Sequence, residues 1–225
     1  ENSINASEVF FSVMGLVLVV YVLFIIILMI INIFIDGTRA EDLMACVISL
    51  TYGGLLLGSA FALEFSEPIL SDGISLWGGM LFAYAYIVIL CTDIFAYFVG
   101  CKFGKHKLCP KISPKKSVEG AVGGLVFGSV LGVLVSWLFD IIPLNSNESF
   151  GINFAWIVVM LFISMMISII GQIGDLVASK LKRTYEIKDY GNLFPGHGGV
   201  MDRFDSLIFS GALFFIIMQV VYLFV

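Results

Sequence analysis

Residues 179–205 read SKLKRTYEIKDYGNLFPGHGGVMDRFD, and they form the longest polar interval in a chain of 225 residues that is 60% hydrophobic. Long apolar segments, 152–178 and 204–225, lie on both sides. The interval combines lysines and arginines with carboxylates and a glycine-rich turn that holds a histidine. We expect that so much charge between two membrane-length segments has a functional role.

The composition of the chain places it in lipid. Only 13% of its residues are charged, whereas soluble domains have about 25%. A helix that crosses a bilayer needs ~20 predominantly apolar residues. The sequence therefore predicts an all-α, polytopic integral membrane protein with about six transmembrane helices, at 9–35, 43–63, 76–99, 118–139, 152–178 and 204–225.

The charges of the connecting loops alternate along the chain. All 12 Lys and Arg residues fall in the loops after the first, third and fifth segments, while the N-terminus and the other two loops carry only acids. Basic loops stay on the cytoplasmic side of a membrane. This pattern predicts a multi-pass protein of a bacterial inner membrane or its equivalent, with loops 100–117 and 179–203 in the cytoplasm and both termini outside.

Small residues and cysteines are expected to be structural. Gly120, Gly124 and Gly128 form a ladder along one helix face, which is typical of close packing between membrane helices. The four cysteines lack the spacing and the neighbouring histidines of a zinc site, so we predict free thiols at Cys46, Cys91, Cys101 and Cys109.

Three acids lie within the third, fourth and fifth apolar segments. Asp93 lies inside the third segment, where a carboxylate is costly and indicates a functional site more often than helix packing. Asp175 lies one turn inside the end of the fifth segment, where it could bind a metal ion or pair with a nearby cation. Glu119 opens the fourth segment, and the helix dipole alone accounts for an acid there.

The loop 100–117 holds six lysines and two stiffening prolines, Pro110 and Pro114. Ser113-Pro-Lys-Lys leads into the fourth segment, so Lys115 and Lys116, with free backbone N–H groups, could form a phosphate site. The alternative is a basic cluster that attracts anionic lipid by ~1 kcal/mol per charge.

The stretch 179–205 combines carboxylates with an anion-binding turn. Gly198 and Gly199 follow a Pro-Gly-His, so their backbone N–H groups could face an anion. Asp202 and Asp205 share one helix face, and Asp189 is a third carboxylate. Mg²⁺ takes one or two carboxylates and leaves its other positions to water and phosphate. Carboxylates beside clustered lysines and arginines therefore suit Mg²⁺–triphosphate chemistry.

Other phosphate and metal sites do not fit the sequence. His197 could donate to a phosphate or act as a general acid, and it could equally be an ordinary loop histidine. A P-loop motif does not occur. The chain has two histidines, which lie in different loops, so a zinc hydrolase is excluded.

The stretch resembles the signature of the phosphatidate cytidylyltransferases, also called CDP-diacylglycerol synthases. That signature runs S-x-hydrophobic-K-R-x4-K-D-x-G-x2-hydrophobic-P-x-H-G-G-hydrophobic-x-D-R-hydrophobic-D, and Ser179 to Asp205 fill it without a gap. TDIFAYFVGCKFGK and PKISPKKSVEG upstream are also similar to the family's central segment. The resemblance covers about 76–225, so we divide the chain into two N-terminal spans, 1–75, and a catalytic membrane domain, 76–225.

The resemblance implies a Mg²⁺-dependent reaction of CTP with phosphatidic acid that yields CDP-diacylglycerol and pyrophosphate. The lipid phosphate is already an anion, so catalysis needs positioning and charge neutralisation and no strong base. By resemblance, the metal ligands are expected first at Asp189 and Asp202, then at Asp205 and Asp175. The expected catalytic residues are Lys188, Asp189, His197, Asp202 and Arg203. Substrate contacts are expected from Asp93, Ser113, Lys115, Lys116, Ser179, Lys182, Arg183, Gly198 and Gly199.

Three alternatives stay open at this point. A CTP-dependent polyprenol or lipid-alcohol kinase would attack the γ-phosphorus and release CDP. A transporter would spread its charges toward the membrane midplane, whereas here they cluster at one face. A lipid-binding homologue without activity is the third.

The expected partners are CTP, phosphatidic acid and the lipid bilayer, with no nucleic acid, and the sequence leaves a homodimer open. Members of the family that the sequence resembles typically have a few more transmembrane spans at the N-terminus than this chain, in which we predict six spans in all. This difference suggests an incomplete chain or a short member.

Overall fold

The computed structural model describes residues 6–34, 39–64, 69–71, 74–76, 78–141, 150–191 and 198–222. It divides into two compact units, Glu1–Tyr52 and Gly53–Val225. Our division at 75/76 followed the signature, not compactness, and the catalytic assignment of 76–225 stays a prediction. All the candidate site residues belong to the second unit.

The first unit is helical. Helix α1 spans Ala6–Phe34, and α2 spans Ala40–Ser49. The backbone N–H of Arg39, before α2, donates to Asp42 Oδ2 at 2.9 Å. After α2 the helix continues as a π-helical segment, η1 (Leu50–Leu56), within which the first unit ends, and then as α3 (Leu57–Ala62) of the second unit. The hydroxyl groups of Tyr21 and Thr51 are hydrogen-bonded at 2.6 Å.

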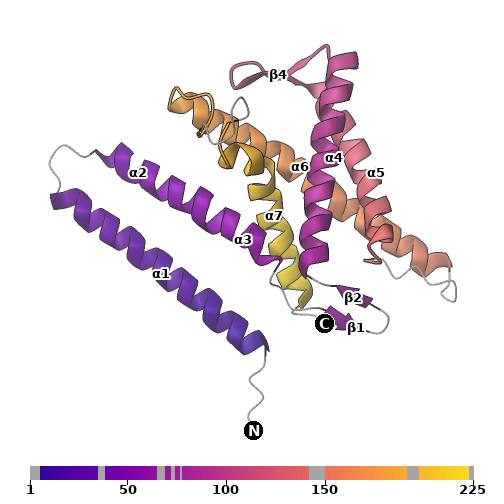
Figure 1. Cartoon of the computed structure of the whole chain (residues 1–225), viewed down its shortest axis with the longest axis horizontal. Coiled ribbons are helices and arrows are strands. Elements are labelled where there is room, and N and C mark those ends of the chain that lie inside the picture. The colour runs from indigo at the N-terminus through magenta and orange to yellow at the C-terminus, as the bar shows by residue number, and fades with distance from the viewer. Residues whose placement is uncertain are drawn as a thin grey trace, which may run out of the picture. The chain divides into compact units, whose positions relative to one another are not determined.

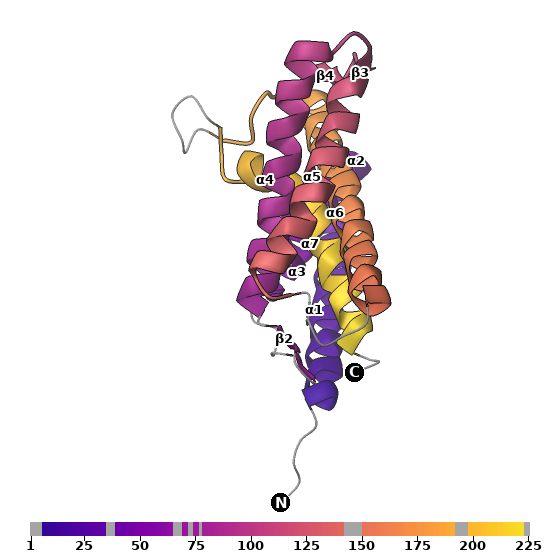
Figure 2. The same ribbon diagram turned by 90° about the vertical axis from the view of Figure 1, so that its right-hand side faces the viewer.

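The second unit is a bundle of α3 with four long helices: α4 (Gly78–Phe103), α5 (Val118–Leu138), α6 (Phe150–Thr184) and α7 (Met201–Tyr222). Helix α5 packs against α4 and α6, and α7 packs against α3, α4 and α6. The antiparallel hairpin β3 (Lys107–Cys109) with β4 (Ser113–Ser117) lies at one end of the bundle. The end of α6 and the start of α7 lie at the same end (Figures 1 and 2). A second hairpin, β1 (Ile69–Ser71) with β2 (Ile74–Leu76), lies at the opposite end.

The glycine ladder of α5 packs against α4, as the sequence predicts. A Cβ atom at Gly124 would lie 2.7 Å from the carbonyl oxygen of Thr92, and one at Gly120 would lie 2.6 Å from that of Ala96. These distances are too short for any side chain. The glycines therefore allow the two backbones to approach closely, which is how small residues stabilise membrane helix pairs.

The helices have the dimensions and polarity of membrane spans. Within the described residues, five helical stretches are long and apolar enough to cross a membrane: the four long helices of the bundle and the continuous stretch Glu41–Ala62, while Leu16–Asn32 of α1 is apolar but shorter. Their outer faces expose large apolar side chains, while serines and threonines are buried inside. Tyr84 bonds Ser164 at 2.7 Å between α4 and α6, and Thr92 donates to Ser168 at 3.0 Å. This arrangement agrees with the predicted multi-pass membrane fold.

The structure differs from the prediction in two details. The two hairpins were not expected in an all-α chain. Helices α4 and α6 also extend beyond their predicted ends at 99 and 178, to Phe103 and Thr184. Lysines and arginines in the last turn interact favourably with the helix dipole, so the charged residues prolong these helices. The predicted free thiols are confirmed for all four cysteines.

Candidate functional site at one end of the bundle

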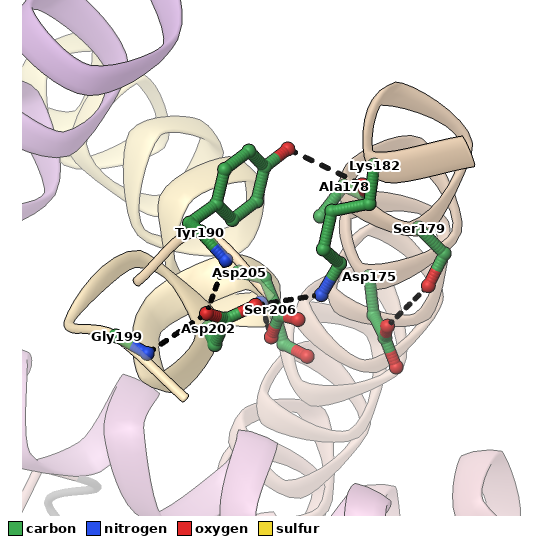
Figure 3. Close-up of polar contacts among 9 residues, drawn as sticks. All are labelled: Asp175, Ala178, Ser179, Lys182, Tyr190, Gly199, Asp202, Asp205 and Ser206. Atoms are coloured by element: carbon green, nitrogen blue, oxygen red, sulfur yellow. Dashed lines mark hydrogen bonds and ion pairs between the residues drawn. The ribbon is translucent and has the colours of Figure 1, made fainter. Parts of the chain in front are cut away.

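Asp202, in the first turn of α7, is the centre of one polar cluster. Its side chain is only 7% exposed. Its Oδ1 accepts from Lys182 Nζ at 2.8 Å, and its Oδ2 accepts from the backbone N–H groups of Tyr190 at 2.8 Å and Gly199 at 2.9 Å (Figure 3). Both carboxylate oxygens are thus engaged. Through these bonds Asp202 connects the start of α7 with Lys182 in the last turn of α6, and with Tyr190 and Gly199 in the segment between the two helices.

The glycines of the turn allow this arrangement. Gly198 has φ +83°, and a Cβ atom there would lie 2.9 Å from Asp202 Oδ2. The sequence predicts that backbone N–H groups of this turn face an anion. In the structure, the anion that the Gly199 N–H contacts is the chain's own Asp202. Residues 192–197 lie outside the described residues, so the prediction for His197 falls outside them too.

Tyr190 lies against the same cluster. Its hydroxyl donates to the carbonyl oxygen of Ala178 in α6 at 3.2 Å, and its ring lies under Lys182, with Nζ 5.3 Å from the ring centroid. Burial and the negative charges of Asp202 and Asp205 raise the pKa of Tyr190 to about 12. The hydroxyl therefore stays protonated at neutral pH and keeps its donor role.

A second group of carboxylates comes from three helices. Asp93 of α4, Asp175 of α6 and Asp205 of α7 are close enough to interact electrostatically with one another. The hydroxyl of Ser206 donates to Asp93 at 3.3 Å, and that of Ser179 donates to Asp175 at 3.3 Å. Neither hydroxyl supplies a compensating charge.

Two lysines reach this carboxylate group from different elements. Lys116, at the end of the β3–β4 hairpin, is ion-paired with Asp175 and interacts with Asp93. Lys182 interacts with Asp205 in addition to its bond with Asp202. The hairpin and the end of α6 therefore meet at one cation–carboxylate cluster.

Glu119 holds the hairpin on α5. Its carboxylate accepts from the backbone N–H groups of Lys105 at 3.1 Å and His106 at 3.2 Å, and it lies 2.6 Å from Nδ1 of the same histidine. Ser117 caps α5 by accepting from the N–H of Gly120 at 3.1 Å. These contacts fix the strand that carries Lys116 and support the structural role expected of Glu119.

The other predicted site residues lie around the cluster. Ser113 is half-buried at the start of β4. Exposed positions are occupied by Lys115, Arg183, Lys188, Asp189 and Arg203. Asp189, one of our two first expected metal ligands, therefore lies on an exposed segment, apart from the group that Asp93, Asp175 and Asp205 form between α4, α6 and α7.

Tyr190 and Ser206 are not among the site residues predicted from the sequence. Tyr190 occupies the variable position of the K-D-x-G motif, so the signature gave no signal for it. Ser206 follows Asp205 directly, and a polar residue so close to a candidate ligand could have suggested it. Within the described ranges, no group of three or more His, Cys, Asp or Glu side chains forms a metal site by itself.

Membrane-length helices that carry a lysine–carboxylate cluster at one end are typical of a multi-pass membrane protein. The chain belongs to the cytidylyltransferase family, whose model matches residues 2–221. The family resemblance of 179–205 is thereby confirmed, and the match extends to the first helices as well.

Two similar proteins have the same name. A "Phosphatidate cytidylyltransferase" of Bacillus subtilis is 39% identical over 126 residues, 56% of this chain and 42% of the relative. A protein of the same name from Staphylococcus haemolyticus is 36% identical over 168 residues, 75% of this chain and 56% of the relative. The chain thus spans about half the length of the curated relatives it matches.

Proposed function

We propose that this chain is the part of a phosphatidate cytidylyltransferase that carries the nucleotide site. A phosphate oxygen of phosphatidic acid attacks the α-phosphorus of CTP, and the bond from that phosphorus to the β-phosphate oxygen breaks. CDP-diacylglycerol and pyrophosphate are the products. The observation that carries the proposal is the Lys116–Asp175 ion pair, since it joins the basic hairpin to α6, the helix that also carries Lys182.

In this proposal, Lys116 and Lys182 bind phosphate groups. Each is half-buried and held against a carboxylate, so its ammonium group is positioned before the substrate arrives. Positive charge fixed in a site of low dielectric stabilises the charge that develops on the transferred phosphorus and on pyrophosphate. Further contacts to the triphosphate come from the exposed set Lys115, Arg183, Lys188 and Arg203.

The cluster fits a Mg²⁺ ion that binds together with the nucleotide. Asp93, Asp175, Asp202 and Asp205 outnumber Lys116 and Lys182, so without a further cation the site would repel a triphosphate. Mg²⁺ requires only one or two protein carboxylates when phosphates supply other ligands. Bound there, it would neutralise charge on the phosphates.

The geometry changes our ranking of the ligands. Both oxygens of Asp202 already accept hydrogen bonds that hold the chain in place. Asp205 and Asp175 have carboxylates in the shared group, so we place them first, with Asp93 next. Asp202 then acts by anchoring the segment, and Asp189 approaches the triphosphate from the exposed side.

We place this end of the bundle at the cytoplasmic face. All the lysines and arginines of the cluster lie in basic loops, which stay cytoplasmic, and CTP is a cytoplasmic solute. The site then lies where the nucleotide can enter from water and the lipid from the bilayer.

The test is a product analysis with CTP and vesicles that contain phosphatidic acid. Cytidylyl transfer yields CDP-diacylglycerol and pyrophosphate in equal amounts. Release of CDP, with no pyrophosphate, would assign the chain to the lipid-kinase alternative and overturn the proposal.

A further inference from the structure

Tyr190 contacts three separate parts of the cluster around Asp202. Its N–H bonds Asp202 at 2.8 Å, its hydroxyl bonds the Ala178 carbonyl at 3.2 Å, and its ring faces Lys182 Nζ at 5.3 Å (Figure 3). Among the described residues, only Tyr190 forms hydrogen bonds to both α6 and α7 while its ring also contacts a lysine of the cluster.

We propose that Tyr190 is a positioning residue that fixes the ammonium group of Lys182 for the phosphates of the substrate. The kinetic part of this proposal rests on the proposed function. The geometric part stands on the contacts alone, because it concerns where the ammonium group lies in the free protein.

The reason lies in the side chain of lysine. Four rotatable bonds connect its ammonium group to the backbone, and ordering a free lysine costs as much as ~2 kcal/mol of side-chain entropy. The side chain of Lys182 is nevertheless only 11% exposed. Asp202 binds one N–H of the ammonium, and the ring of Tyr190 stabilises a second face through a cation–π interaction. In this proposal a further N–H of the ammonium group donates to a phosphate of the substrate.

Ring and hydroxyl have separable roles. The ring contacts Lys182, whereas the hydroxyl contacts the backbone of α6. Tyr190→Phe removes the hydroxyl bond and keeps the ring, while Tyr190→Leu removes both. The backbone N–H that bonds Asp202 is present in every variant. Tyr185, which is 52% exposed in the same segment, provides the matched control variant Tyr185→Leu.

The first measurement does not depend on activity. The full chain in lipid is labelled with an amine-reactive ester, and mass spectrometry compares Lys182 with exposed Lys180, two residues before it. Lys182 should react more slowly than Lys180 in the unchanged protein. We expect Tyr190→Leu to accelerate labelling of Lys182 about fivefold relative to Lys180. Tyr190→Phe should give less than half of that increase, and Tyr185→Leu none.

The second measurement separates positioning from general stability. Because Lys182 would hold the nucleotide phosphates, Tyr190→Leu should raise KM for CTP about fivefold with a smaller change in kcat. Tyr190→Phe, which keeps the ring, should have a KM for CTP close to that of the unchanged protein. Equal labelling of Lys182 in the unchanged protein and in Tyr190→Leu would overturn the proposal. If the unchanged protein makes no CDP-diacylglycerol, the proposed function fails, while the labelling result still decides the role of Tyr190.

Discussion

The two basic regions at the site end of the bundle look alike in sequence and differ in structure. The hairpin region, residues 105–117, exposes Lys107, Lys111 and Lys115, and in the described part of the chain one of its lysines, Lys116, is ion-paired with a carboxylate. In the region from the end of α6 to residue 191, Lys182 is nearly buried between Asp202 and Tyr190. The number of cations in a loop therefore does not predict its contribution to the site.

Burial explains the difference. An exposed ion pair in water contributes at most about 1 kcal/mol, and an exposed lysine near a bilayer mainly attracts anionic lipid. A lysine held against carboxylates at a partly buried site interacts more strongly because water screens it less. The comparison predicts that variants of buried cluster residues have large effects and variants of exposed residues small ones.

The largest effect is expected for Asp205→Asn. This change removes a carboxylate from the group shared by α4, α6 and α7, and CDP-diacylglycerol formation should fall about a thousandfold. Asp189→Asn, at an exposed position, should cause a clearly smaller loss. If kcat/KM for CTP fell more in Asp189→Asn than in Asp205→Asn, the metal site would have to be assigned to the exposed segment that carries Asp189.

Lys116→Gln tests the hairpin. Loss of this ammonium group should lower kcat/KM about a hundredfold, because it removes a fixed positive charge near the reacting phosphates. Lys111→Gln, in the same hairpin but exposed, is the control and should change it less than twofold. Similar losses in both variants would mean that the hairpin acts as a diffuse charge and not through one lysine.

Part of this molecule follows from its sequence. The six helical segments follow from the length of the apolar runs, and close packing of α5 on a neighbouring helix follows from Gly120, Gly124 and Gly128, although the sequence does not show that this neighbour is α4. The signature alone identified the family. The hairpins escaped prediction because their strands have three and five residues, too few for a periodic pattern.

The arrangement within the site could not be predicted in the same way. Asp202 and Asp205 share one helix face, yet one binds the chain's own backbone and the other joins Asp93 and Asp175. That difference depends on how α4, α6 and α7 approach one another, which spacing along one helix does not encode. For the same reason the prediction from the sequence ranked Asp189 ahead of Asp205 as a metal ligand.

Gly124→Ala tests the packing that brings α4 to the site. Its Cβ atom would meet the Thr92 backbone at 2.7 Å, whereas nothing lies within 4 Å of a Cβ atom at Gly58. Overpacking costs about 1–3 kcal/mol, so Gly124→Ala should lower the Tm of the protein in lipid and reduce activity with it. Gly58→Ala should leave both unchanged. Equal Tm values for the two variants would contradict the close α4–α5 contact.

The smallest effect concerns alkaline pH. The pKa of Tyr190 is raised to about 12 from its ordinary value of 10.0, so the folded state favours the protonated hydroxyl. This contribution to stability is fully present below pH 10 and is lost as the pH rises toward 12. Tyr190→Phe should lack this loss, which denaturation of the two proteins at pH 9 and pH 11 would measure. The same alkaline loss in both proteins would contradict the burial of this hydroxyl.

The most direct test of the central claim uses CTP labelled on its α-phosphate, vesicles of phosphatidic acid, and a parallel reaction with γ-labelled CTP. We predict that only the α-label enters the lipid, with release of pyrophosphate, and that EDTA stops the reaction and added Mg²⁺ restores it. Entry of the γ-label into lipid, or entry of the α-label that EDTA leaves unchanged, would contradict cytidylyl transfer at a Mg²⁺–carboxylate site.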